Sequence, residues 1–202
     1  VVFAVDTPVS IDGSNAGTLE DVFVRDRTAA TTRLVSKNTA GQAGNNSSDQ
    51  PSISPNGRYV AFRSFSSNLV VTPSGSAIYV RDRQASTTTN MPLPPGAQIC
   101  GEPRISDFGD IVARCSMLAA QEQVFLYRVT EGGVFYQLST AQGGGNGNGA
   151  SGTATSISAD GNFFAFDSAA SNLVAGDTNS SIDVFYAVDL EALSAIFSDG
   201  FE

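Results

Sequence analysis

The distribution of hydrophobic and polar positions repeats along the chain. Three segments each combine a short hydrophobic stretch, a turn containing glycine, and a second stretch rich in β-branched and aromatic residues. The turn pairs Asn56-Gly57 and Asp160-Gly161 are favoured in two-residue hairpins, because both central positions of a type I′ turn need positive φ. The segments therefore predict β-hairpins. They are residues 52–62, 104–114 and 156–166, and their serines Ser54, Ser106 and Ser158 are 52 positions apart (106 − 54 and 158 − 106).

Two further segments follow each hairpin. The first is dominated by aromatic and β-branched residues, which is typical of a strand buried on both faces between stacked sheets. The second is more polar and often Thr-rich, which indicates an edge strand. Only residues 190–193 show a helical period. Four strands in about 50 residues predict a propeller blade. The buried-type segments are 21–26, 77–82, 123–128 and 183–189, and the edge-type segments are 31–36, 87–91 and 134–139.

Three motifs in these repeats resemble those of a known family. They are the Ser-x-Asn/Asp-Gly-x-x-x-Ala-Phe hairpin, the Ser-Asn-Leu-Val stretches at 67–70 and 171–174, and the Asp-Val-Phe-Val-Arg-Asp segment at 21–26. Together they resemble TolB-type β-propeller repeats over nearly the whole chain. The resemblance implies a propeller fold and carries no catalytic motif. It is not specific for function, because the family includes periplasmic scaffolds, domains appended to peptidases and secreted proteins. Residues 196–202 also resemble a short C-terminal tail of some exported proteobacterial proteins.

We therefore expect one all-β domain over residues 1–202, a β-propeller of about four four-stranded antiparallel blades. The first blade begins on its second strand and lacks its own first strand. TolB-like rings normally have six or more blades, so a four-bladed ring, an open arc and a fragment all remain open. The expected blades are residues 1–40, 50–95, 100–140 and 153–202.

The two ends of the chain offer the missing strand. Residues 195–201 are similar to the first strand and turn of the fourth blade, and residues 1–6 are similar to the strand that should follow. Within one chain this match closes the ring and removes the exposed edges. Between chains it donates a strand and produces a head-to-tail filament. The residues proposed for closure or assembly are Val1, Val2, Phe3, Ala4, Val5, Ala195, Ile196, Phe197 and Phe201.

Two cysteines, Cys100 and Cys115, flank the hairpin of the third blade. Hairpin geometry places position 115 opposite about position 102, close enough to Cys100 for a bridge after a modest adjustment. Two buried thiols in a cytosolic protein are the alternative. The low Lys content and the Asn/Gly/Ser/Thr-rich loops favour the disulfide and an exported protein, whether periplasmic, cell-surface or extracellular.

Composition excludes several classes of function. The chain has no His, so it has no Ser-His-Asp triad and no imidazole base. Its 11 Lys+Arg against 20 Asp+Glu give a net charge of −9, which argues against a nucleic-acid partner. No apolar stretch reaches the roughly 20 residues that membrane insertion requires. We expect a non-enzymatic binding or assembly scaffold whose partner is a protein or another copy. A filament subunit and an accessory domain of a secreted hydrolase are the alternatives.

Oxygen-bearing side chains alternate in one loop of the fourth blade. Asp177, Asn179, Ser181 and Asp183 have a spacing that can wrap a hard cation, so calcium is a candidate ligand. The alternative is that these residues form Asx turns and cap the strand.

Two other sets of polar residues recur between repeats. Arg63, Cys115 and Asp167 are expected at equivalent positions after the second strand of each blade, with Asp6 as the fourth member. They could bind a polar ligand at the channel, or they are solvated strand ends. The Arg-Asp-Arg triplets at 25–27 and 81–83 occupy the same place in two repeats, and we interpret them as ion pairs within the repeat.

Overall fold

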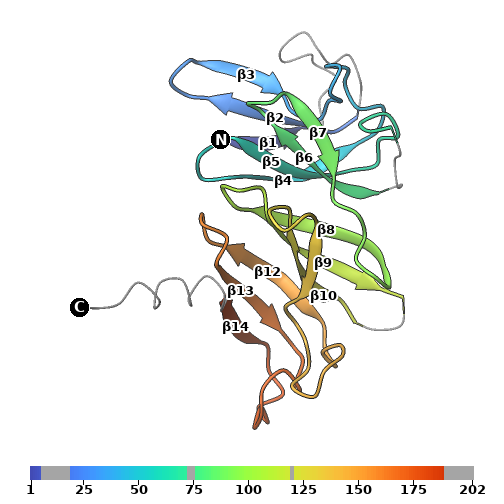
Figure 1. Ribbon diagram of the computed structural model, residues 1–202, viewed down its shortest axis with the longest axis vertical. Coiled ribbons are helices and arrows are strands. Elements are labelled where there is room, and N and C mark those ends of the chain that lie inside the picture. The colour runs from blue at the N-terminus through green and yellow to red at the C-terminus, as the bar shows by residue number, and fades with distance from the viewer. Residues whose placement is uncertain (6–18, 72–75, 119–120, 189–202) are drawn as a thin grey trace, which may run out of the picture.

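The computed structural model describes residues 1–5, 19–71, 76–118 and 121–188, and these residues form only β-strands, turns and loops (Figure 1). The strands make four antiparallel sheets, numbered 1 to 4 in chain order. Sheet 1 consists of β1 (Val2–Val5), β2 (Asp21–Asp26) and β3 (Thr31–Leu34). Sheet 2 consists of β4 (Ser48–Ile53), β5 (Tyr59–Ser64), β6 (Ala77–Asp82) and β7 (Thr87–Asn90). Sheet 3 consists of β8 (Ala97–Ile105), β9 (Ile111–Met117), β10 (Gln123–Arg128) and β11 (Val134–Gln137). Sheet 4 consists of β12 (Ser151–Ile157), β13 (Phe163–Ser168) and β14 (Asp183–Val188).

Each sheet is a meander whose strand order follows the chain. This confirms the all-β class, and sheets 2 and 3 contain the four-strand unit expected from the repeats. Sheet 1 begins at the second strand of the unit, as expected. Residues 189–202, which contain the strand proposed to complete sheet 1, lie outside the described residues, as does Asp6.

The four sheets are stacked in chain order. β1 and β2 pack on β4, β5 and β6 pack on β8, and β9 and β10 pack on β12. Sheets 1 and 4 lie at opposite ends of the stack (Figure 1). The two inner sheets are therefore covered on both faces, whereas each end sheet has one face turned away from the stack.

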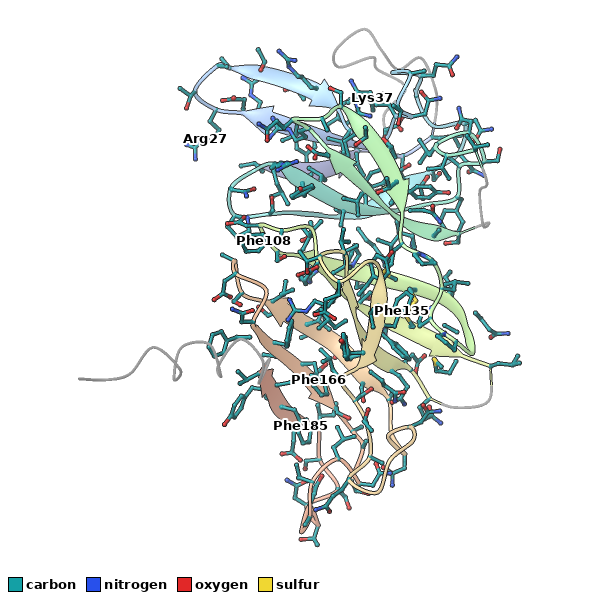
Figure 2. All side chains as sticks on the ribbon, in the orientation of Figure 1. Arg27, Lys37, Phe108, Phe135, Phe166 and Phe185 are labelled. Atoms are coloured by element: carbon teal, nitrogen blue, oxygen red, sulfur yellow. A yellow bond between two sulfur atoms is a disulfide. The ribbon has the colours of Figure 1, made fainter. Side chains whose placement is uncertain are left out.

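Side chains alternate between neighbouring sheets and build a separate core in each interface. In sheet 2, Val60 and Phe62 join the core shared with sheet 1, while Ala61 joins the core shared with sheet 3. In sheet 4, Phe166 and Phe185 stack with their ring centroids 5.7 Å apart and face sheet 3 (Figure 2). The prediction that the aromatic segments are buried on both faces is confirmed for β6, for β10 and for residues 21–24 of β2. It is wrong for β14, in which Val184 and Tyr186 are exposed, because no sheet follows sheet 4 among the described residues.

Two kinds of connection join the sheets. The loops between sheets 1 and 2 and between sheets 3 and 4 each contain a small antiparallel bridge, Lys37 with Ala43 and Thr140 with Asn146. The second loop contains the Gly-rich segment 143–149, which the bridge holds as it holds the counterpart loop. Residues 91–96, with the sequence Met-Pro-Leu-Pro-Pro-Gly, join sheet 2 to sheet 3.

Candidate assembly surface

The outer face of sheet 4 carries exposed hydrophobic side chains. Tyr186 on β14 lies opposite Ala165 on β13, and Val188 lies opposite Phe163, so these residues share one face with Val184. Val184 is 80% exposed, Tyr186 is 82% exposed and Phe163 is 49% exposed. The opposite face of the same strands packs on sheet 3 through Phe164, Phe166 and Phe185. We call Phe163, Ala165, Val184, Tyr186 and Val188 the sheet 4 outer face.

The corresponding face of every other sheet is covered by the next sheet in the stack. The third strands of the four units align by their central aromatic residues, Phe23, Tyr79, Phe125 and Phe185. Val184 and Tyr186 therefore have three pairs of equivalents, all of them buried. These are Val22 and Val24 (0% and 4% exposed), Ile78 and Val80 (1% and 9%), and Val124 and Leu126 (0% and 3%).

The outer side of sheet 1 does not offer a comparable surface. Phe3 and Phe23 stack on that side with their ring centroids 6.0 Å apart, and Leu34 lies opposite Phe23. Phe23 is only 1% exposed and Leu34 only 2%. Among the residues that the structure describes, sheet 4 is thus the end sheet that presents an exposed apolar face.

A row of charged groups runs along the first and second strands of sheets 2 and 3. Arg63 Nε donates to Asp49 Oδ1 at 2.8 Å, and this hydrogen bond raises the pKa of Arg63. In sheet 3, Arg114 Nη2 lies 3.2 Å from Glu102 Oε1, and the Glu102 amide donates to Gln50 Oε1 at 2.8 Å. Gln50, Arg63, Glu102 and Arg114 line a cavity of about 100 Å³, and the charged groups among these four are each in an ion pair.

The prediction that Cys115 occupies the position equivalent to Arg63 and Asp167 is wrong. Ser106 N–H bonds to Asp110 O, whereas Ser54 and Ser158 bond to the fifth residue after them. The turn of the third unit is therefore one residue shorter, and the following strand shifts by one position. Arg114 is the true equivalent of Arg63, since it lies opposite Gly101 as Arg63 lies opposite Asp49.

In sheet 4 the equivalent position holds Asp167. Its carboxylate accepts hydrogen bonds from the Ala154 amide at 2.8 Å and from the Thr153 hydroxyl. Burial opposes the charged form, but these bonds outweigh it and lower the pKa of Asp167. At all three positions a strand-to-strand contact occupies the polar side chain, which favours a structural role.

Cys100 and Cys115 form a disulfide, with their Cα atoms 4.0 Å apart. Cys100 lies within β8. It is directly opposite Cys115, where position 102 was expected, and a register shift between Gly101 and Arg104 adds a residue to this strand. The same register position in sheet 2 holds Ser48 and Ser64, whose hydroxyls are 2.8 Å apart. In sheet 4 it holds Ser151 and Ser168 at 2.7 Å. The disulfide thus replaces a repeated buried hydroxyl pair.

Three of the four residues considered for calcium, Asn179, Ser181 and Asp183, are joined by hydrogen bonds. Asn179 Nδ2 donates to both carboxylate oxygens of Asp183, at 3.2 and 3.3 Å, and the Ser181 amide donates to Asn179 Oδ1 at 2.8 Å. Across the described residues, no three or more His, Cys, Asp or Glu side chains gather as metal ligands. The arrangement is that of an Asx turn, the alternative to a cation site.

Calcium binding by this loop is tested by thermal unfolding. If Asp177, Asn179, Ser181 and Asp183 bind the ion, a calcium concentration 100 times the dissociation constant adds about 2.7 kcal/mol to the free energy of unfolding. The melting temperature should then rise with calcium and fall with a chelator, and the Asp177→Asn variant should lose the response. Equal melting temperatures with calcium and with chelator would exclude the site.

The Arg-Asp-Arg triplets are partly explained by ion pairs. Asp82 pairs with Arg58 at 2.8 Å, and this contact lowers the pKa of Asp82. Asp26 instead accepts hydrogen bonds from the amides of the following turn. Arg81 bonds to two neutral acceptors, Asn38 O and Thr88 Oγ1.

The fold and surface define the class as an all-β protein of four stacked antiparallel sheets with one exposed apolar end face. Within the described residues there is no helix long and apolar enough to cross a membrane. Neither a family model nor a curated protein matches the chain. Among solved structures, the hydrazine synthase of Kuenenia stuttgartiensis is similar, with a TM-score of 0.43 and 13% identity over 72% of this chain. The match spans 42% of that chain, so it covers less than half of the larger protein.

Sequence reasoning missed the sheet 4 outer face. It treated the aromatic segments as core and searched for charged residues. The missing signal was available in the repeats, because Val184 and Tyr186 align with residues of three other strands that each require a covering sheet.

Proposed function

We propose that this protein is an exported, non-enzymatic scaffold built from propeller-type repeats, which assembles through the sheet 4 outer face. The four successive sheets, made from the same strand unit and packed face to face in chain order, support the propeller-type interpretation. The disulfide between Cys100 and Cys115 supports an oxidising, exported environment. Assembly rather than catalysis is proposed because the chain has no His and its charged row is paired internally.

The exposed sheet 4 outer face carries this proposal. An exposed apolar patch of this kind marks an interaction site. We assign it to a second copy of the chain, because in the other three sheets the equivalent face is covered by a sheet of the same repeat. Since Phe23 and Leu34 are buried on the outer side of sheet 1, the contact is sheet 4 against sheet 4, related by a two-fold axis. Antiparallel sheets pack in this way about 10 Å apart.

The Val184→Glu variant tests the dimer. A carboxylate at this position would be buried without a partner in the contact, so we expect the dimer to dissociate at least about 100-fold more readily. Sedimentation velocity over a range of micromolar concentrations measures the change. The matched control is Val71→Glu, the same substitution at a side chain that is 99% exposed and lies between β5 and β6. A wild-type chain that stays monomeric at all concentrations contradicts the proposal.

Strand donation into a filament is a second candidate, favoured by the three strands of sheet 1 where sheets 2 and 3 have four. In this arrangement residues 195–201 of one copy add the missing strand beside β1 of the next. It predicts open-ended polymers instead of dimers. Deletion of residues 195–201 should then abolish association, while Val184→Glu should leave it intact.

A further inference from the structure

A groove of about 330 Å³ between sheets 1 and 2 is lined by three arginines. Arg33 on β3 lies opposite Val24, a residue of the core shared with sheet 2, so Arg33 stands on the face turned toward sheet 2. Arg81 on β6 lies opposite Val60, so it stands on the face turned toward sheet 1. Arg83 follows at the end of β6. We call Arg33, Arg81 and Arg83 the arginine groove.

Several N–H groups of the guanidinium side chains in this groove have no hydrogen-bond acceptor among the described residues. Arg81 is only 6% exposed, and its Nη1 donates to Asn38 O at 3.1 Å and to Thr88 Oγ1 at 3.0 Å, both neutral acceptors. Burial lowers the pKa of Arg81, as expected for a cation without a carboxylate in contact. In the described part of the chain, Nε and Nη2 of Arg81 have no hydrogen-bond partner, and Arg33 has neither a hydrogen-bond nor an ion-pair partner through its side chain.

Little negative charge opposes these cations. Asp26 is the only carboxylate among the described residues that line the groove. Its Oδ1 already accepts hydrogen bonds from the amides of Thr28 and Ala29, both at 2.9 Å. The nearby Asp82 is paired with Arg58. The groove is therefore positively charged on a protein whose net charge is −9.

The next interface of the stack provides an internal comparison. A groove of about 320 Å³ lies at the corresponding place between sheets 2 and 3. At the positions equivalent to the three arginines it has Thr89, Tyr127 and Val129. The positive charge of the arginine groove is thus not required by the repeat or by the packing of its sheets.

We propose that the arginine groove binds a tetrahedral oxyanion, the phosphate or sulfate group of a molecule about the size of a monosaccharide phosphate. Guanidinium groups present parallel N–H donors that match oxyanions in a bidentate way. The volume of the groove falls at the lower end of the range for small-molecule sites. The site is separate from the sheet 4 outer face, so it can be tested whatever the assembly state.

Calorimetric titration of the full chain with sodium phosphate and with sodium sulfate tests the site, against sodium chloride at equal ionic strength. We expect saturable binding of one oxyanion per chain at millimolar affinity. Tighter binding of phosphate identifies a phosphorylated ligand, and tighter binding of sulfate identifies a sulfated one. Glucose 6-phosphate should bind more tightly than inorganic phosphate if the remaining volume holds a sugar ring. No saturation beyond that seen with chloride would overturn the proposal.

Two variants replace an arginine of the groove with the residue found at the equivalent position between sheets 2 and 3. Arg33→Thr and Arg83→Val should each weaken oxyanion binding at least about tenfold, because each removes a charge-assisted contact. Arg27→Thr removes the same charge from the tip of the β2–β3 hairpin, where the side chain points away from the molecule (Figure 2), and should change affinity less than about twofold. Equal losses in Arg27→Thr and Arg33→Thr would show a general charge effect and would refute a built site. Melting temperatures confirm that each variant is folded.

Discussion

Replacing Cys100 and Cys115 together with alanine is expected to lower the free energy of unfolding by about 3 kcal/mol. The disulfide closes a loop of 15 residues between strands that are paired side by side. A cross-link over a loop of this length restricts the unfolded chain by about that amount. Urea unfolding of the variant and of the wild-type protein measures the difference. Reduction and alkylation of the wild-type protein should produce a loss of similar size.

Replacing the same two cysteines with serine should cost less, about 2 kcal/mol. The neighbouring sheets show that two serines at this register form a buried hydrogen bond, which contributes about 1 kcal/mol. The serine variant is a control for the loss of the covalent bond alone, because it restores the pair found in sheets 2 and 4. Identical stabilities of the serine and alanine variants would contradict the equivalence of the three positions.

The second large effect is expected at a buried ion pair of sheet 3, which lies beside Gly161 and Phe164 of sheet 4. Asp110 Oδ2 accepts from Arg128 Nη1 at 2.9 Å, and the two side chains are 1% and 5% exposed. Asp110 also accepts a hydrogen bond from the Val129 amide at 2.8 Å. Asp110→Ala should lower the free energy of unfolding by about 3–5 kcal/mol, because it removes the buried carboxylate from a buried cation and leaves only Glu131, which is 3.7 Å from Arg128 and 40% exposed. Thermal and urea unfolding measure the loss.

Two further variants separate the ion pair from ordinary packing. Adding Arg128→Met to Asp110→Ala should recover part of the loss, since the buried charge is then removed as well. Arg58→Met removes one partner of the surface pair with Asp82, where the Arg58 side chain is 42% exposed, and should cost less than about 1 kcal/mol. A loss below 1 kcal/mol for Asp110→Ala would contradict the expected role of the buried pair.

The order of strands was predictable from the sequence, because the local signals for hairpins and buried strands agree. Asn56-Gly57 and Asp160-Gly161 lie in hairpin turns as expected, but the predicted type I′ geometry is wrong: only Gly57 and Gly161 have positive φ, both of 74°, and their amides donate to Ser54 O and Ser158 O. The aromatic third strands of sheets 2 and 3 fall where predicted and are buried, because a strand covered on both faces consists of continuous apolar residues. These features depend on residues close together in the chain.

Register was less predictable, because one residue added or removed changes the face of every later side chain. The turn from Ser106 to Asp110 is one residue shorter than its two counterparts, which displaced Cys115 from its expected equivalence. The first strands of sheets 2 and 3 contain a register shift beside Gln50 and Glu102, both at positive φ. Neither irregularity follows from composition or hydrophobic pattern.

The candidate sites were harder still, because their chemistry depends on what covers each side chain. Val184 and Ile78 are similar residues at equivalent positions, and only the presence of the next sheet buries one of them. Arg25 and Arg81 likewise occupy the first position of two equivalent triplets, yet Arg25 is exposed and Arg81 is buried. Exposure of this kind is a property of the stack, which a single repeat does not contain.

The two bridged loops indicate the unit by which a chain of this kind is lengthened or shortened. Lys37 and Thr140 are 103 positions apart (140 − 37), as are Ala43 and Asn146 (146 − 43), while the connection between sheets 2 and 3 has no such loop. The repeating module at this level is therefore a pair of sheets, each pair with its own internal core. Duplication or loss of a module changes the chain in steps of about 100 residues and preserves an even number of sheets.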